Sequence, residues 1–88
     1  MRVVVVWKDY TDYSREVIDW LREFKRRTGV DLESLDPDTR EGESFARTYD
    51  ILQYPTVIAV AGHNGAEQKR WSGTPMPLID EVNFYVIS

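Results

Sequence analysis

The chain has 88 residues, of which 42% are hydrophobic and 30% are charged, and these values are typical of one folded domain. Its 15 acidic and 11 basic residues give a net charge of −4, which excludes the basic surface that nucleic-acid-binding proteins depend on. There is no cysteine, so disulfides, thiolate metal sites and cysteine-based catalysis are excluded as well. We therefore expect residues 1–88 to form one globular domain without a nucleic-acid partner.

A strand over residues 3–7 and a helix over about residues 12–28 are the first two predicted elements. The strand is a run of valines closed by a tryptophan, which is typical of a strand buried on both faces. In the helix, Val17, Leu21 and Phe24 recur at i, i+4 and i+7 and form an apolar stripe. Basic side chains in its last turn and a glycine directly after it are typical signals of a helix end.

A second strand and a short second helix follow. Residues 30–35 alternate apolar and polar side chains, which predicts a half-exposed strand. Phe45, Tyr49 and Leu52 then mark a helix over about residues 43–50. The two elements are separated by a proline turn, in which the strand ends.

The last part of the chain predicts a hairpin and a third helix. Residues 56–61 and 67–71 are the two strands, and the turn Gly62-His63-Asn64-Gly65 joins them, with His63 as a turn residue. The helix begins at Pro75 or Pro77 and buries Leu78, Ile79, Val82 and Tyr85 or Val86. The order of elements is therefore β-α-β-α-β-β-α, with strands one and two parallel and strands three and four antiparallel.

Three stretches carry a resemblance to a known family. They are Val5-Val6-Trp7-Lys8-Asp9-Tyr10-Thr11-Asp12-Tyr13-Ser14-Arg15, then Tyr49-Asp50-Ile51-Leu52-Gln53-Tyr54-Pro55-Thr56, and the segment from Asn64-Gly65 to Trp71-Ser72-Gly73. In this order they resemble the strand and C-x-x-C turn, the cis-proline loop and the terminal hairpin of the thioredoxin-like superfamily, in its short glutaredoxin-sized form. The resemblance implies an α/β thioredoxin-like fold, with a mixed four-stranded sheet of order 2-1-3-4 and helices on both faces.

The resemblance places Thr11 and Ser14 at the positions of the two cysteines. The family's reaction needs a thiolate at a helix N-terminus, and a hydroxyl group has no comparable acidity and forms no mixed disulfide. Val5 and Ser34 stand where many thioredoxins carry a buried acid and its lysine partner, so the groups that move protons are missing too. We therefore expect a redox-inactive chain that is not an enzyme.

Once redox catalysis is excluded, the function that the resemblance still implies is the binding of a peptide or of glutathione. In the family, the backbone beside the cis-proline pairs with an extended peptide or with glutathione, which predicts a cis Tyr54–Pro55 bond here. We expect a protein- or peptide-binding module without a cofactor or metal. The predicted site consists of Lys8, Tyr10, Thr11, Asp12, Tyr13, Ser14, Tyr54, Pro55, Thr56, Trp71, Gly73 and Thr74.

Several alternatives stay open. Thr11, Asp12 and Ser14 would also serve as simple caps of the first helix. Lys8, with Gly73 and Thr74, would contact glutathione in a degenerate glutathione-binding domain. A third alternative is a ligand-free or designed module. Five aromatic residues are expected to gather at one end of the sheet as a partner surface, namely Trp7, Tyr10, Tyr13, Tyr54 and Trp71. The alternative is that Trp7 and Trp71 pack in the core while the tyrosines are scattered.

The sequence also leads to expectations about the setting of the protein. The longest apolar run, residues 3–7, is too short to cross a membrane, and no secretory signal follows Met1. A cytoplasmic, monomeric protein without a membrane partner is therefore expected.

Overall fold

The computed structural model describes residues 1–88, and its elements follow the predicted order. No helix is both long enough and apolar enough to cross a bilayer. The elements are β1 (Arg2–Val6), α1 (Ser14–Thr28), β2 (Glu33–Leu35), α2 (Arg40–Thr48), β3 (Thr56–Val60), β4 (Glu67–Ser72) and α3 (Ile79–Val86).

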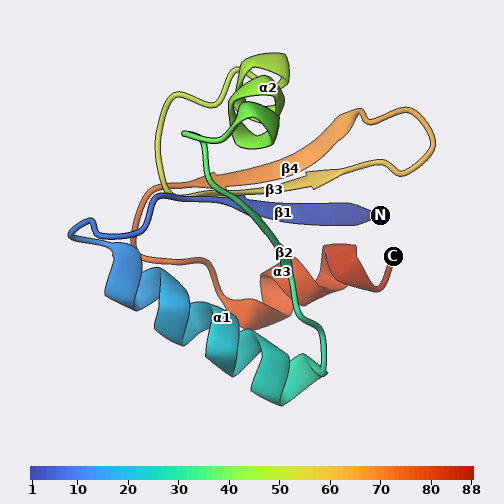
Figure 1. The fold of residues 1–88 in the computed structure, drawn as a ribbon. Coiled ribbons are helices and arrows are strands. Elements are labelled where there is room, and N and C mark those ends of the chain that lie inside the picture. Colours follow the sequence, from blue (N-terminus) through green and yellow to red (C-terminus); the bar gives the residue numbers. More distant parts are fainter.

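The four strands form one mixed sheet in the order β2-β1-β3-β4, which confirms the predicted topology. β1 pairs with β2 in parallel, while β3 pairs antiparallel with both β1 and β4. Helices cover both faces of the sheet: α1 and α3 lie together on one side and α2 lies alone on the other (Figure 1). The crossover through α1 is what allows the first two strands to run in the same direction.

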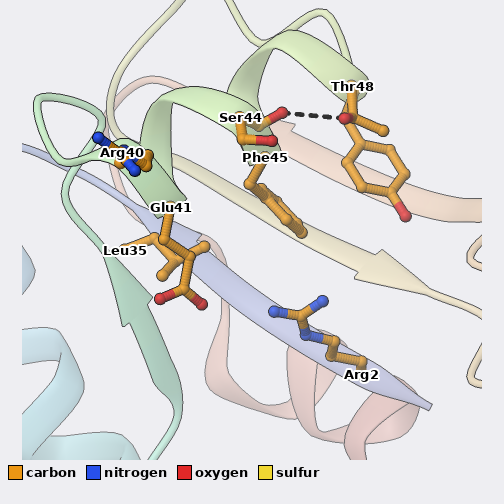
Figure 2. A pocket seen from close by; sticks show the side chains of 8 residues that line it. Arg2, Leu35, Arg40, Glu41, Ser44, Phe45 and Thr48 are labelled. Carbon is orange, nitrogen blue, oxygen red and sulfur yellow. Dashed lines mark hydrogen bonds between the residues drawn. The ribbon is translucent and has the colours of Figure 1, made fainter.

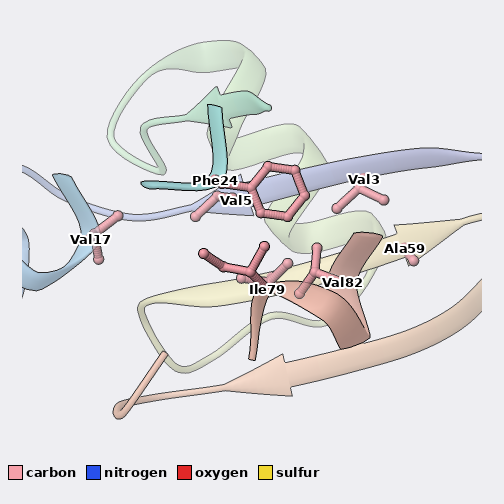
Figure 3. Packing of buried hydrophobic residues seen from close by; sticks show 8 residues of the cluster. Val3, Val5, Val17, Phe24, Ala59, Ile79 and Val82 are labelled. Atoms are coloured by element: carbon pink, nitrogen blue, oxygen red, sulfur yellow. The ribbon is translucent and has the colours of Figure 1, made fainter. Parts of the chain in front are cut away.

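Alternate residues of β1 supply the two halves of the core. Val3 and Val5 point to the side of α1 and α3, where they meet Phe24 in the first cluster (Figure 3). Val4 and Val6 point to the side of α2 and form the second cluster. All four valines are buried, because the strand has a helix layer on each face.

The bounds of several elements differ from the predictions, and α3 begins at Ile79 rather than at Pro75 or Pro77. α2 occupies residues 40–48 rather than about 43–50, because the Thr39 side chain accepts a hydrogen bond from the Gly42 N–H at 3.1 Å and caps the helix earlier. β2 is confined to residues 33–35 of the expected 30–35. Val30 and Leu32 pack against the first core cluster instead of pairing with β1.

Leu78, which was predicted to be buried, and Leu52, which was used to mark the second helix, are both exposed. Leu78 is 70% exposed, because it precedes α3 in extended backbone and its side chain is not on the buried stripe of the helix. Leu52 is 85% exposed, because α2 ends at Thr48 and the left-handed backbone at Asp50 (φ +54°) redirects the chain. The expectation that Leu78 is buried is therefore wrong, and Leu52 is not part of the helix that it was used to mark.

Replacing Gly42 with alanine is expected to destabilise the fold. A Cβ atom at Gly42 would lie 1.9 Å from the backbone oxygen of Asp36, which has no room to move away as a flexible side chain would. Such overpacking costs about 1–3 kcal/mol or more, which exceeds the gain of about 0.5–1 kcal/mol that alanine gives a helix. Urea unfolding measures the difference. Gly62→Ala is the control, because nothing lies within 4 Å of its added Cβ, and equal stabilities of the two variants would contradict the prediction.

Candidate functional site

Three loops meet at one end of the sheet. The turn after β1, the loop before β3 and the loop after β4 all lie at the left edge of Figure 1. This follows from the topology, because β1 and β4 both run antiparallel to β3 and end where it begins. We call residues 8–14, 53–56 and 72–74 together the loop surface. It contains every residue of the predicted site except Trp71.

The turn of residues 8–14 is held by its own hydroxyl groups. Thr11 Oγ1 donates to the Lys8 carbonyl at 3.1 Å, and Ser14 Oγ donates to the Thr11 carbonyl at 2.9 Å. Tyr13 accepts a hydrogen bond on its hydroxyl from the Lys8 N–H at 2.9 Å. The expected cap by Thr11, Asp12 or Ser14 is wrong, since the N-cap of α1 is Tyr13 and no side chain caps the helix. The two hydroxyls are donors to the turn rather than acceptors from the helix.

Tyr10 projects from this turn into solvent. Its side chain is 98% exposed, and its backbone has the left-handed φ of +58°. Such a conformation costs a non-glycine residue of the order of 1–3 kcal/mol. The Asp9 side chain stabilises it by accepting the Tyr10 N–H at 2.8 Å. The turn therefore presents one aromatic ring that contributes nothing to the core.

The Tyr54–Pro55 peptide bond is cis, and the loop around it is fixed from both sides. The Pro55 carbonyl accepts the Gly73 N–H at 2.7 Å, and Thr56 Oγ1 donates to the Gln53 carbonyl at 2.6 Å. Gly73 has φ +77°, and a Cβ there would lie 2.6 Å from the Gln53 amide nitrogen. In contrast, neither the N–H nor the carbonyl of Tyr54 makes a hydrogen bond within the protein.

The loop after β4 is anchored on α1. The Met76 N–H donates to the Glu16 carboxylate at 2.8 Å, and Trp20 donates its indole N–H to the Pro77 carbonyl at 2.8 Å. The Thr74–Pro75 bond in this loop is also cis. Thr74 itself is exposed at the edge of the loop surface.

Lys8 is directed toward α2 rather than toward the turn that follows it. Its ammonium group is 3.3 Å from an Asp38 carboxylate oxygen and 5.6 Å from the centre of the Tyr54 ring. The contact brings the first loop and the cis-proline loop together. Lys8 is the only charged group that was expected to contact glutathione, and it already has Asp38 as a partner within the protein.

The aromatic residues of the predicted site do not form one cluster. Trp7, Tyr13 and Trp71 pack against the core cluster beneath α1 and α3. Tyr54 packs against the other cluster, beneath α2, and Tyr10 packs against neither. The side chains of Tyr54 and Trp71 therefore lie on opposite faces of the sheet. The in–out alternation of side chains along a strand does not predict this for Tyr54, because Tyr54 lies in a loop.

No catalytic constellation is present at the loop surface. Val5 is fully buried among apolar side chains, and Ser34, its neighbour in the strand ladder, is exposed. His63 lies in the hairpin at the far end of the sheet, and no three His, Asp or Glu side chains lie close enough to hold a metal ion. Without a thiolate, thiol–disulfide exchange is not available to this chain.

A cavity of about 270 Å³ adjoins the loop surface on the side of α2. Ile51, Leu52 and Tyr54 form its apolar part, and Arg47 and Glu43 lie at its α2 wall. Sequence reasoning missed Leu52 as a residue of the cavity that adjoins this surface. Its position directly before the Tyr54–Pro55 loop was the available signal, but its spacing from Phe45 and Tyr49 was used to mark a helix instead.

The largest cavity, about 580 Å³, lies elsewhere, between α2 and the start of β1, and no predicted site residue lines it (Figure 2). Arg2 makes a bidentate contact with Glu33 at 2.9 and 2.7 Å, and its guanidinium lies 5.1 Å from the centre of the Phe45 ring. The hydrogen bonds from Arg2 lower the pKa of Glu33 and raise that of Arg2 itself. Arg2, one of the two arginines that line this cavity, already has its counter-charge in Glu33, and we do not assign the cavity a ligand.

Known structures are similar to this chain over almost its whole length. Thioredoxin 1 from the thermophilic eubacterium Thermosipho africanus TCF52B superposes with a TM-score of 0.65 at 20% identity, covering 99% of this chain and 91% of that one. A malarial protein gives a TM-score of 0.64 at 15% identity, with 97% and 91% covered. A designed protein gives 0.62 at 22% identity, with 98% and 72% covered. No protein-family model and no curated protein sequence matches the chain.

These similarities and the observed topology agree with the resemblance that the sequence motifs carry. The similarity to thioredoxin 1 covers 99% of the chain, and the chain has no cysteine at any position. The chain therefore has a thioredoxin-like fold, and it lacks both cysteines of the C-x-x-C motif.

Proposed function

We propose that the chain is a non-catalytic module that binds an extended segment of another protein at the loop surface. The observation that carries this proposal is the free backbone of Tyr54, whose N–H and carbonyl have no partner within the protein. An extended chain satisfies such groups by pairing with them as a strand does. The fixed carbonyl of Pro55, held by Gly73, keeps the loop in place for this pairing.

The side chains around Tyr54 suit the same ligand. Leu52 is exposed and lines the 270 Å³ cavity with Tyr54, which offers a place for one apolar side chain of the segment. Tyr10 is exposed on the turn after β1, at the same end of the sheet. Exposed aromatic and aliphatic anchors beside a small cavity are common features of binding surfaces. Asp9 and Asp12 form no salt bridge, so the bound segments are expected to be enriched in basic residues.

An extended segment is a better candidate than glutathione. Lys8, the cation that would contact glutathione, is 3.3 Å from Asp38 and lies against the Tyr54 ring. Glutathione binding would have to separate this ion pair or leave the carboxylate of the ligand without its partner. A peptide paired with the Tyr54 backbone requires neither.

The proposal is tested by selecting ligands from a library of random linear peptides and measuring their affinity for three variants. Tyr10→Ala and Leu52→Ala are each expected to weaken binding about tenfold, the effect of losing one well-placed anchor. Leu78→Ala is the matched control, because Leu78 is also an exposed leucine but lies neither in the loop surface nor in the cavity beside Tyr54. Glutathione is titrated in parallel. Failure to enrich any peptide would contradict the proposal, as would peptides that bind the Tyr10 and Leu52 variants as tightly as the parent.

A further inference from the structure

A second candidate site lies between β4 and α3, on the opposite face of the sheet from the Tyr54 ring. It is a cavity of about 250 Å³ lined by Lys69, Trp71, Glu81, Phe84 and Tyr85. Three of these five residues are aromatic, and none of the five lines the cavity beside Tyr54. The volume is below the range of about 300–1,000 Å³ that is usual for larger ligands, so the cavity suits a small head group.

The Tyr85 ring stands at a steep angle to each of the other two rings. Tyr85 and Trp71 have centroids 5.5 Å apart and planes at 78°, and Tyr85 and Phe84 have centroids 5.2 Å apart and planes at 81°. Rings that are perpendicular rather than stacked present faces in different directions, as the walls of a box do. Phe84 is 64% exposed, so burial in the core does not account for its position.

The cavity already contacts a positive charge. The ammonium group of Lys69 lies over the Trp71 ring, 5.9 Å from its centroid. A ring face attracts a cation at this distance through the quadrupole of its π system. Lys69 is exposed and forms no salt bridge, so its flexible side chain can leave the ring when another cation takes its place.

Glu81 supplies a negative charge beside the rings. Its carboxylate accepts the Trp71 indole N–H at 3.1 Å and forms no salt bridge with any basic side chain. The hydrogen bond fixes the orientation of the indole, and the charge of the carboxylate remains without a cationic partner. Three aromatic walls and one carboxylate are the chemistry that recognises a quaternary ammonium group.

We propose that this cavity binds a quaternary ammonium group, with Trp71, Phe84 and Tyr85 as its walls and Glu81 as its counter-charge. Lys69 acts as an internal competitor for the Trp71 face. A primary ammonium ion is strongly hydrated and needs several hydrogen-bond acceptors, and the carboxylate is the one charged acceptor here. A methylated ammonium group loses little hydration on entering and gains contact with each ring.

The experiment uses the Trp71 indole N–H resonance of the full chain as its reporter. Tetramethylammonium chloride is expected to shift this resonance, and ammonium chloride at the same concentrations is expected to leave it in place. Lys69→Gln is expected to raise the affinity for tetramethylammonium roughly two- to fivefold, the equivalent of one exposed cation–π contact. Lys25→Gln is the matched control, because it makes the same change in net charge on a different element.

Two further variants separate a binding site from a structural contact. Phe84→Leu and Glu81→Gln are each expected to weaken binding at least twofold without changing the thermal midpoint, because both side chains are exposed. Ile87→Ala, an exposed apolar position just after α3, is expected to change neither. The proposal is overturned if tetramethylammonium leaves the indole resonance unmoved in both the parent and Lys69→Gln. Equal affinities in the parent, Phe84→Leu and Glu81→Gln would overturn it too.

The source of the group is settled by two more titrations. Choline represents a free small molecule, and a peptide carrying one trimethylated lysine represents a modified protein. A peptide that binds at least tenfold more tightly than choline would assign the site to a modified protein segment. Equal affinities for choline and for the peptide would assign the site to the free cation. Either assignment also requires that the Phe84→Leu variant binds the ligand more weakly than the parent does.

Discussion

The double variant Thr11→Cys/Ser14→Cys is expected to form an intramolecular disulfide in air and to reduce a small aromatic disulfide when its thiols are free. The parent chain has no cysteine and is expected to do neither. The two positions are joined by a turn in which the Ser14 N–H donates to the Thr11 carbonyl at 3.2 Å. Such turns bring the two Cα atoms within about 7 Å, which matches the reach of a disulfide.

The thiol at position 11 is also expected to be more acidic than free cysteine. It lies just before the first turn of α1, and the positive end of a helix dipole lowers the pKa of a thiol. The single variants Thr11→Cys and Ser14→Cys are the controls, since neither can close an internal disulfide. Thiol counting and mass spectrometry give the result. Two free thiols after air oxidation, or disulfides only between molecules, would show that the turn does not have the geometry of the C-x-x-C motif.

Phe24→Ala is expected to lower the free energy of unfolding by about 3–5 kcal/mol. Phe24 is fully buried in the cluster beneath α1 and α3, and its ring lies 5.4 Å from that of Trp20. Removing the ring leaves a cavity that the strand and the two helices cannot close completely. Since small domains have about 5–15 kcal/mol of stability in total, much of the fold's stability would be lost.

Chemical unfolding followed by circular dichroism measures this loss. Phe84→Ala makes the same change of residue at a position that is 64% exposed, and it is expected to cost less than about 1 kcal/mol. Similar losses for the two variants would mean that α1 does not bury its apolar stripe as described. The comparison therefore tests the packing of the longest helix on the sheet.

The element order and sheet topology were predictable because the strongest local patterns agree with one another. The valine run needs cover on both faces, and the stripe of Val17 and Phe24 supplies part of it. The Asn64-Gly65 turn predicted the hairpin, and Gly65 does have a positive φ, +70°. These signals are local, and tertiary packing strengthens them rather than opposing them.

The missed boundaries have physical causes that periodicity does not contain. Leu78 fits a helical stripe by spacing, but it lies one residue before α3. α2 ends at Thr48, two residues earlier than its predicted end. Thr39 begins α2 one turn earlier than the apolar pattern indicates, because a single hydroxyl satisfies a free N–H. Side-chain caps and residues with left-handed backbone decide where a helix begins and ends. The sequence offers several residues that could fill each of these roles, so it does not fix the boundary.

The candidate site was predictable in its backbone and much less so in its side chains. The turn at Thr11 and the loop at Pro55 lie at one end of the sheet, as the resemblance implied. The direction of Trp71 depends on the strand register, in which it lies opposite Val57 and therefore faces α3. The cavity of Phe84 and Tyr85 had no sequence signal, because adjacent aromatics on a helix are usually divided between core and solvent.

Amide NMR of the isotope-labelled parent chain, titrated with a selected linear peptide, tests the central claim most directly. The account predicts shifts at residues 8–15, 54–56 and 72–74, with the Tyr54 amide among the largest because its N–H becomes paired. Glutathione at the same concentrations is expected to produce smaller shifts. The absence of any shift at millimolar peptide, or shifts confined to the cavity between α2 and β1, would contradict the assignment of the loop surface as the binding site.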